Sequence, residues 1–389
     1  MGRESAYDLQ ALREREFPWA ARGDAIYLNN ASTGPLPVCT VEAQASFTAL
    51  RAEPFRLTDE AQFATIRRSR ELCAQLIGAT PGEIALMVNT TYGINLAARA
   101  LPLAAGDTVL SFDREFPANV YPWMALERAG VRLERVPCEG ALPDEAALHR
   151  ALEKPGVRAV TVSWVSFATG YRADLATIGR ACRERGIYLV VDAMQGLGAA
   201  ALDVRACNID ILACGGQKWL MSPWGTGFVY VRGELVQQLE PSAVGWLAMR
   251  ASEDFTRLTD YEFAYFDDAR RFEVLTVPFQ DFAGFNASLE LLLDIGPERV
   301  ERHVAVLVDQ AVEWAQSRGD MRLVTPADPE RRAGIVSIAP PDPRAASDRL
   351  RQVRVSHSLR EGAIRLSPHC YNTREEVARA LDVLGDQGA

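Results

Sequence analysis

The sequence predicts an α/β protein, with a mostly parallel mixed sheet flanked by helices and a smaller C-terminal α+β domain. Between about residues 60 and 235, short apolar strands alternate with helical stretches. The strands are rich in valine and isoleucine on both faces, which indicates a sheet covered on both sides. After Pro278 the pattern changes to long helices and a few short strands, which indicates a second, smaller unit.

Six strands of the main sheet are expected from apolar runs bounded by turn residues. They cover residues 83–88, 108–112, 159–164, 187–191, 209–214 and 227–231. Helices are expected at residues 62–76, 94–101, 123–128 and 174–185, and Gly186 would cap the last of them. Ligands of such sheets bind at the carboxyl ends of the strands, so we expect the functional residues at that edge.

The C-terminal part is expected to begin with helix over residues 282–318, interrupted at Gly296 and Pro297. Short strands follow at 334–339 and 363–367, and a closing helix covers 373–384, with Asn372 or Thr373 as its cap. We therefore expect an N-terminal arm (1–25) that packs near the small domain, a large domain (26–280) and a small domain (281–389).

Charge and cysteine usage narrow the classes of partner. The 389 residues carry 42 basic and 51 acidic side chains, a net charge of −9. Such a chain repels phosphate backbones and anionic lipids, so neither nucleic acid nor a membrane is an expected partner. The polar N-terminus is unlike a signal sequence and no apolar stretch reaches spanning length, which favours a soluble cytoplasmic protein. The seven cysteines are scattered and never spaced as CxxC, so no metal site is expected.

Lysine is rare in this chain. Of the 42 basic residues, only Lys154 and Lys218 are lysines. Arginine can replace lysine as a surface cation but not as a nucleophile, because its guanidinium stays protonated. Codon bias is an alternative explanation for the scarcity. Lys154 lies in a Lys-Pro-Gly turn and is expected to be solvated, whereas Lys218 directly follows an apolar run and is the candidate for covalent chemistry.

A carboxylate and an amine are predicted to open onto one crevice. Asp192 follows the apolar strand at 187–191, Gln195 comes three residues later, and Lys218 follows the next strand. If the two strands are neighbours, this is what pyridoxal 5′-phosphate (PLP) requires. The carboxylate keeps the pyridine nitrogen protonated while the amine forms a Schiff base. Gln195 is then placed to hydrogen-bond the ring hydroxyl, although Asp192 taken alone fits a strand-end cap better.

A polar turn after the strand at 83–88 leads into a helix and is a candidate phosphate site. The hydroxyls of Thr90 and Thr91, together with the free amides of the helix N-terminus, would form the cradle. An ordinary asparagine or threonine helix cap explains the same residues.

Five motifs, in the correct order along the chain, resemble the class V aminotransferase family. That family includes cysteine desulfurases, kynureninase and isopenicillin N epimerase-like proteins. The motifs are Tyr27-Leu-Asn-Asn-Ala-Ser-Thr-Gly34, Glu115-Phe116-Pro-Ala-Asn119, Asp192-x-x-Gln195 with Lys218, Arg271-Phe-Glu273-Val-Leu-Thr276 and Ile364-Arg365-Leu-Ser367-Pro-His369. The resemblance implies PLP fold type I, PLP as the cofactor, an amino acid as the substrate, and a homodimer with active sites at its interface.

The resemblance also implies roles for individual residues. Lys218 would carry the cofactor and Asp192 would hold its pyridine nitrogen. Further cofactor contacts are implied for Thr90, Thr91, Phe116, Gln195, Gln217 and, from the other subunit, Thr276. Arg365 would bind the substrate carboxylate with its two-pronged guanidinium, and Asn30 and Ala31 would line the substrate pocket.

The chain departs from the desulfurase-like members of this family. Gln217 stands where they have histidine and Gly215 where they have serine, so Thr90, Thr91 or Ser222 must complete the phosphate site. Sulfur transfer also needs a nucleophilic cysteine on the loop before the carboxylate arginine, and residues 352–362 contain none. A persulfide-forming desulfurase is therefore not expected.

Transamination is the reaction that we expect, because Lys218 alone can remove the Cα proton and redeliver it to C4′ of the cofactor. β-Elimination by a C–S lyase is the first alternative. Epimerisation is the second and needs another acid, for which Tyr92, Tyr121 and His357 are candidates. A scaffold protein that has lost PLP chemistry is a further alternative, but such a protein would not be expected to keep its catalytic lysine.

Overall fold

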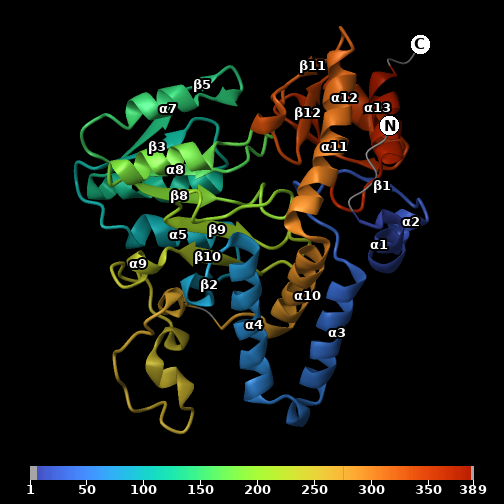
Figure 1. The fold of residues 1–389 in the computed structure, drawn as a ribbon. Helices are drawn as coiled ribbons and strands as arrows, with labels where there is room; N and C mark the ends of the chain where they lie inside the picture. Colours follow the sequence, from blue (N-terminus) through green and yellow to red (C-terminus); the bar gives the residue numbers. More distant parts are fainter. Residues whose placement is uncertain (1–6, 275, 387–389) are drawn as a thin grey trace.

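A seven-stranded mixed sheet lies at the centre of the structure, a computed structural model that describes residues 7–274 and 276–386 (Figure 1). The first six residues of the expected arm, position 275 and the last three residues lie outside the described part. In sheet order the strands are β2 (Ile84–Leu86), β10 (Gly227–Val231), β9 (Ile211–Gly215), β8 (Tyr188–Asp192), β7 (Val157–Ser163), β3 (Thr108–Phe112) and β4 (Arg132–Val136). Of these seven, β10 alone runs antiparallel to its neighbours, which confirms the expected mostly parallel mixed sheet.

Helices cover both faces of this sheet, because alternate residues of each strand point to opposite sides. Leu189 and Val191 of β8 belong to the larger apolar core, while Val190 belongs to the smaller one. The larger core takes side chains from α4 (Asp59–Ile77), α7 (Glu145–Ala151), α8 (Leu175–Glu184) and α10 (Phe279–Ile295). The smaller core takes them from α5 (Thr90–Ala100), α6 (Tyr121–Met124) and α9 (Gly233–Val236).

The C-terminal region forms a second sheet with its own helices, at the upper right of Figure 1. Its strands, in sheet order, are β11 (Arg322–Leu323), β12 (Val336–Ala339), β15 (Ala363–Leu366) and β14 (Ser358–Arg360), all antiparallel to their neighbours. The helices are α11 (Pro297–Gln316), α12 (Pro343–Gln352) and α13 (Arg374–Gly385). The expected interruption is present: α10 ends before Gly296, whose φ is 93°, and α11 begins at Pro297.

The N-terminal segment lies against these C-terminal elements. It contains α1 (Leu9–Glu16), α2 (Pro18–Ala21) and β1 (Ile26–Tyr27), and β1 pairs in parallel with β13 (Val355–Ser356). Arg13 is buried and its Nη2 lies 2.8 Å from Oε1 of Glu376 in α13. Figure 1 shows α1 and α2 beside the C-terminal elements, while α3 (Val38–Ala52) runs alongside α10. The domain limits stay a prediction.

Some local expectations were wrong or incomplete. The predicted helix at 123–128 is the short α6 followed by a tighter 3₁₀ helix over Ala125–Ala129, which Gly130 ends in a left-handed conformation. The elements that the sequence did not predict include the helices α1, α3, α7 and α12 and the strand β4. A small hairpin of β5 (Cys138–Glu139) and β6 (Leu142–Pro143) was also not predicted. Within the described ranges, no helix is long and apolar enough to cross a membrane, and no three histidine, cysteine or acidic side chains gather as metal ligands.

Candidate active site

The two central residues of the predicted site meet at one edge of the main sheet. β8 and β9 are parallel neighbours, with Asp192 opposite Ala213. Asp192 is the last residue of β8, and Lys218 follows the end of β9 by three residues. Parallel strands end at the same edge, so both side chains belong to the crevice where this fold class binds ligands.

Burial shifts both groups away from their ordinary titration ranges. Asp192 is only 4% exposed, and burial raises its pKa to about 6, although the Met194 amide and the charge of Lys218 oppose that change. Burial lowers the pKa of Lys218 to about 8 against the attraction of Asp192, and the positive charge of Arg365 lowers it further. An appreciable share of Lys218 is therefore neutral, and nucleophilic, near pH 8.

Phe116 offers an open aromatic face to this crevice. The Lys218 Nζ lies 5.5 Å from the centroid of the Phe116 ring, and Phe167 packs edge-on against the same ring at 5.3 Å between centroids. Phe116 is nevertheless 43% exposed, so its other face is accessible. A flat heteroaromatic ring could stack there beside the lysine.

The turn before α5 combines the two interpretations that the sequence left open. Asn89 is an ordinary helix cap, since its Oδ1 accepts the Tyr92 amide at 2.9 Å. Thr90 is buried and its Oγ1 accepts the Gly215 amide at 2.9 Å, which joins α5 to the end of β9. Thr91 is exposed at the start of the helix, where the free backbone amides favour an anion.

Gln217 contributes an unsatisfied polar group next to this turn. Its buried Oε1 has no hydrogen-bond partner among the described residues. A Cβ atom on Gly215 would lie 2.7 Å from that oxygen and 3.4 Å from the Thr90 hydroxyl, so only glycine leaves room for the amide here. The oxygen and nitrogen of such an amide are interchangeable by rotation, and the rotated group would offer N–H donors. These features fit the phosphate of PLP.

Ser222, by contrast, is already engaged. Its hydroxyl donates to the Leu220 carbonyl at 2.8 Å and its amide donates to Gly216. It therefore has no free proton to give to a phosphate, and Thr91 and Gln217 are better placed to complete the site.

The N-terminal segment is fixed against the lysine loop. Gly34 lies so close to the Lys218 backbone that a Cβ atom would be 2.0 Å from its carbonyl oxygen. Asn30 is fully buried: its side chain donates to the Ser367 carbonyl at 2.7 Å and accepts from the Tyr371 hydroxyl at 3.0 Å. The Asn30 side chain thus holds the wall of the pocket, and a direct substrate contact by Asn30 stays a prediction.

Gln195 connects the N-terminal segment to the loop that carries Lys218. Its Nε2 donates to the Ala31 carbonyl at 3.0 Å, and its Oε1 accepts from the Trp219 indole at 2.8 Å. The Ala31 amide donates to the Ser367 hydroxyl, so the backbone of Ala31 is also held within the fold. One N–H of Gln195 remains for a ring hydroxyl.

Arg365 is a buried cation without an acidic partner. It lies on β15 and is 2% exposed. Its Nη1 donates to the Phe167 carbonyl at 2.7 Å and its Nη2 donates to the Ser32 hydroxyl at 2.9 Å, but its Nε is unbonded and no described carboxylate pairs with it. Burial, and secondarily the charge of Arg360, lower the pKa of Arg365 to about 10. Such a guanidinium is unfavourable until an anion joins it.

Two contacts of the site were missed from the sequence. Ser32 holds Arg365, and the only signal was its place in the Tyr27–Gly34 motif. Glu115 precedes Phe116 and accepts hydrogen bonds from both the amide and the hydroxyl of Ser163. These two hydrogen bonds fix the Phe116 loop to β7. Burial, reinforced by the charge of Asp192, raises the pKa of Glu115 to about 7.

The other predicted candidates are not brought to the centre of the site. Thr276 is exposed, and its role across a dimer stays a prediction. His357 is held by Ser347 and by the Val355 carbonyl, and Tyr121 projects into solvent. Lys154 is exposed and paired with Glu134, as its turn position predicted.

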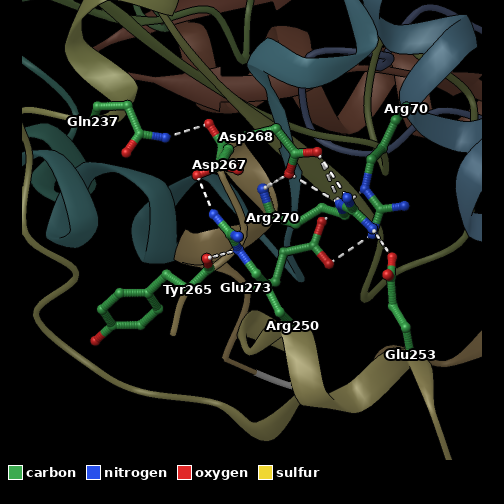
Figure 2. Close-up of polar contacts among 9 residues, drawn as sticks. All are labelled: Arg70, Gln237, Arg250, Glu253, Tyr265, Asp267, Asp268, Arg270 and Glu273. Carbon is green, nitrogen blue, oxygen red and sulfur yellow. Dashed lines mark hydrogen bonds and ion pairs between the residues drawn. The ribbon is translucent and has the colours of Figure 1, made fainter. Parts of the chain in front are cut away.

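A separate cavity of about 460 Å³ lies between α4 and the loop that precedes α10. Figure 2 shows four polar residues of its lining, Arg70, Glu253, Arg270 and Glu273, together with polar side chains that are not part of the lining. Arg70 binds Glu273 through two hydrogen bonds of 2.9 and 2.7 Å, and both side chains are buried. Arg270 pairs with Asp268 at 2.9 Å and with Glu253 at 3.2 Å (Figure 2). Arg70 and Arg270 of this cavity are thus already paired with acidic side chains of the protein itself.

Comparison with known proteins agrees with this geometry. A family model described as Aminotransferase class-V matches residues 26–380. The chain is 31% identical over 379 residues to a probable cysteine desulfurase of Methanothermobacter thermautotrophicus, which covers 91% of this chain and 92% of that protein. It is 31% identical to the uncharacterized aminotransferase YcbU of Bacillus subtilis (81% of each chain) and 29% identical to isopenicillin N epimerase of Streptomyces clavuligerus (92% and 94%).

A solved structure shares the fold. The cystine C–S lyase C-DES, in complex with its reaction product cysteine persulfide, superposes with a TM-score of 0.87 over 96% of this chain and 100% of that chain, at 24% identity. The chain therefore belongs to the class V aminotransferase family of PLP-dependent enzymes. The expected family, PLP fold type I and the cofactor of the family are confirmed.

Proposed function

We propose that this protein is a PLP-dependent aminotransferase that acts at the Cα of an amino acid, with Lys218 as the lysine that carries the cofactor. The observation that supports this most is that one site contains both a lysine with a lowered pKa and a buried arginine without an acidic partner. Lys218 has a pKa lowered to about 8, and Arg365 is a buried guanidinium with no acid beside it among the described residues. An amino acid supplies the carboxylate that Arg365 lacks.

Each part of the cofactor has a matching group in the chain. Asp192 would hold the pyridine nitrogen, Phe116 the face of the ring and Gln195 the ring hydroxyl. Thr91, Gln217 and the amides that begin α5 would hold the phosphate, Thr90 would position the turn, and Thr276 would reach the phosphate of the other subunit. PLP, when bound, supplies an electron sink for negative charge at Cα.

The protein's own residues divide the remaining work. Arg365 would bind the α-carboxylate through both of its terminal nitrogens, which orients the Cα–H bond. The Lys218 amine would remove the proton from Cα and deliver it to C4′ of the cofactor, the 1,3-shift that transamination requires. A base whose pKa lies near 8 is suited to both transfers at neutral pH.

β-Elimination is the second candidate, because the same lysine can begin it and a probable cysteine desulfurase is among the relatives. Transfer of sulfur to the enzyme is not supported. Cys370 is fully buried and lies beyond Arg365, and burial raises its pKa above the ordinary range. Epimerisation, named for another relative, needs a second acid, and His357 is held away by Ser347.

We also infer a homodimer. Large aromatic side chains are exposed on the segments on either side of β10, with Trp224 at 70% before the strand and Tyr261 at 91% after it. Exposed apolar groups of this size are typical of interaction surfaces. Light scattering is expected to give twice the mass of the 42.8 kDa chain, and a monomer at micromolar concentration would contradict this inference.

The reaction itself can be tested in single turnover. The purified protein, reconstituted with PLP, is mixed with a panel of amino acids while the cofactor absorption band is followed. We expect one amino acid to leave pyridoxamine 5′-phosphate and a stoichiometric keto acid. Recovery of the original band with pyruvate and a thiol would establish the lyase instead, and an inverted amino acid the epimerase. Failure to retain PLP would contradict the proposal altogether.

A further inference from the structure

A groove of about 720 Å³ opens directly beside Arg365. The Phe167 ring lines it, and the Phe167 carbonyl accepts the hydrogen bond from Arg365, so the groove and the carboxylate anchor share one residue. The groove continues to β11, to the tip of the β14–β15 hairpin and to the loop that carries Phe116. A side chain that leaves an amino acid held by Arg365 has this space to enter.

Three arginines from three separate segments line the groove. Arg114 lies in the Phe116 loop, Arg322 on β11 and Arg360 at the end of β14. In the part of the chain that the structure describes, none of the three forms an ion pair. The single hydrogen bond of the Arg360 guanidinium is to the Leu359 carbonyl, at 3.1 Å. Their positive charges are therefore not neutralised by the protein.

The two acids of the groove do not change this balance. Glu115 is committed to Ser163, which accounts for both of its oxygens. Glu361 lies in the hairpin turn with a φ of 46°, next to Gly362, and forms no ion pair with the groove arginines.

The backbone conformation at Arg114 and Arg360 is consistent with a ligand-binding role for these two arginines. Arg114 has a φ of 64°, in the left-handed region that non-glycine residues rarely adopt, and such strain is concentrated at ligand-binding positions. On β14, Ser358 and Arg360 share one face because they are two residues apart. Ser358 lies opposite Arg365 and its hydroxyl is 3.4 Å from the Arg365 Nη2, so Arg360 lies on the side of the hairpin that carries the anchor.

We infer that this groove selects amino acids whose side chain ends in a second carboxylate, with Arg114, Arg322 and Arg360 as the residues that recognise it. The inference rests on the proposed function, since it assigns the α-carboxylate to Arg365. It names the class of substrate, an acidic amino acid, within that function. The unneutralised charge of the groove is matched by one further anionic group on the ligand.

The test compares side chains of equal shape and different charge. Glutamate and glutamine are mixed separately with the PLP-loaded enzyme, and aspartate and 2-aminoadipate extend the series in length. Each exposed ion pair contributes only a few tenths to 1 kcal/mol, so we expect an acid preference of roughly 3- to 100-fold from three arginines. The preference is expected to fall as salt is raised, because the groove is open to solvent.

Variants assign the preference to the groove. Arg322→Gln and Arg360→Gln are each expected to lower the rate for the preferred acid about 2- to 5-fold relative to the rate for its amide. Arg158→Gln is the matched control: Arg158 is exposed and lies at the start of β7, the end of the strand opposite the site. Equal rates for glutamate and glutamine, or equal losses for both substrates in the variants, would overturn the inference.

A binding measurement separates this inference from the proposed reaction. Calorimetry with glutarate and with its monoamide, on the PLP-loaded protein, needs no turnover. Tighter binding of glutarate that weakens in Arg360→Gln supports the groove even if no amino acid reacts, in which case only the proposed function fails. Equal binding of the two ligands overturns the inference, whatever the reaction proves to be.

Discussion

Arginines line two hollows of this molecule in opposite ways. In the cavity beside α4, Arg67 pairs with Glu60, Arg70 with Glu273, and Arg270 with Asp268 and Glu253. In the groove beside Arg365, the arginines Arg114, Arg322 and Arg360 form no ion pair within the described residues. A cavity whose charges are already matched is stabilised by its own side chains, whereas a groove with excess charge is complete only with a ligand.

This difference predicts whether the substitution of an arginine lowers stability or weakens ligand binding. Removal of one member of a buried pair leaves an uncompensated charge, which lowers stability. Removal of an unpaired cation at the site leaves no such charge and instead weakens ligand binding. The four predictions that follow test this contrast, from the largest effect to the smallest.

Lys218→Ala is expected to reduce product formation by roughly 10²- to 10⁴-fold, because in the proposed function the amine serves as both the cofactor attachment and the base. Lys154→Ala is the matched control, since Lys154 is exposed and paired with Glu134. Steady-state assays with the amino acid found in single turnover provide the measurement. Retention of most of the activity in Lys218→Ala would mean that another group carries the chemistry.

Arg70→Ala is expected to lower the free energy of unfolding by about 3–5 kcal/mol, because Glu273 would stay buried without its partner. Urea denaturation measures the loss, and Arg70→Met with Glu273→Met should recover most of it. Arg250→Ala is the control. Arg250 pairs with Asp267 at 2.5 Å on the surface, so its removal is expected to cost no more than about 1 kcal/mol (Figure 2). Equal losses in the two single variants would remove the contrast between the buried pair and the exposed one.

Arg365→Ala is expected to lower kcat/KM roughly 30- to 150-fold. This corresponds to about 2–3 kcal/mol of transition-state stabilisation, lost with the charge-assisted hydrogen bonds to the substrate. Its free energy of unfolding should stay within about 1 kcal/mol of the wild type, because no buried acid is left unpaired. Arg365→Lys keeps the charge without the two-pronged geometry and should restore activity only in part. A large loss of stability with unchanged kinetics would make Arg365 a structural residue.

The pH dependence of cofactor attachment tests the lowered pKa of Lys218. Only the neutral amine attacks the aldehyde of PLP, and in the folded apoprotein half of Lys218 is neutral at about pH 8 rather than 10.5. The attachment rate, followed by absorbance, should therefore rise roughly tenfold per pH unit below 8 and level off above it. A rate that climbs steadily to pH 10 would show an unperturbed lysine.

Much of the fold could be predicted because the buried strands carry their own signal. β3 and β10 were predicted with the bounds that the structure shows, since each is a short, mostly apolar and fully buried segment. β4 was missed because it is an edge strand: Arg132, Glu134 and Arg135 interrupt any apolar pattern. Pairing with β3, a long-range interaction, makes it a strand.

The meeting of the candidate residues Asp192 and Lys218 could be predicted from the sequence, but the charge balance around them could not, and the roles of the candidate residues stay a prediction. Asp192, Lys218 and Arg365 are marked by motif and position, and the sheet order then explains why the first two meet. Whether an arginine forms an ion pair depends on distances between segments that are far apart in sequence, as with Arg70 and Glu273. No local pattern indicates that Arg70 is paired with an acid or that Arg365 is not.

The attachment of PLP to Lys218 is the claim on which the rest depends, and it can be measured directly. Borohydride reduction of the PLP-loaded protein fixes the cofactor to the lysine that holds it, and peptide mass spectrometry then locates the adduct. The chain has only two lysines, so Lys154 is an internal control in the same digest. We expect the phosphopyridoxyl mass on the Lys218 peptide alone. An adduct on Lys154, or on neither lysine, would contradict the account.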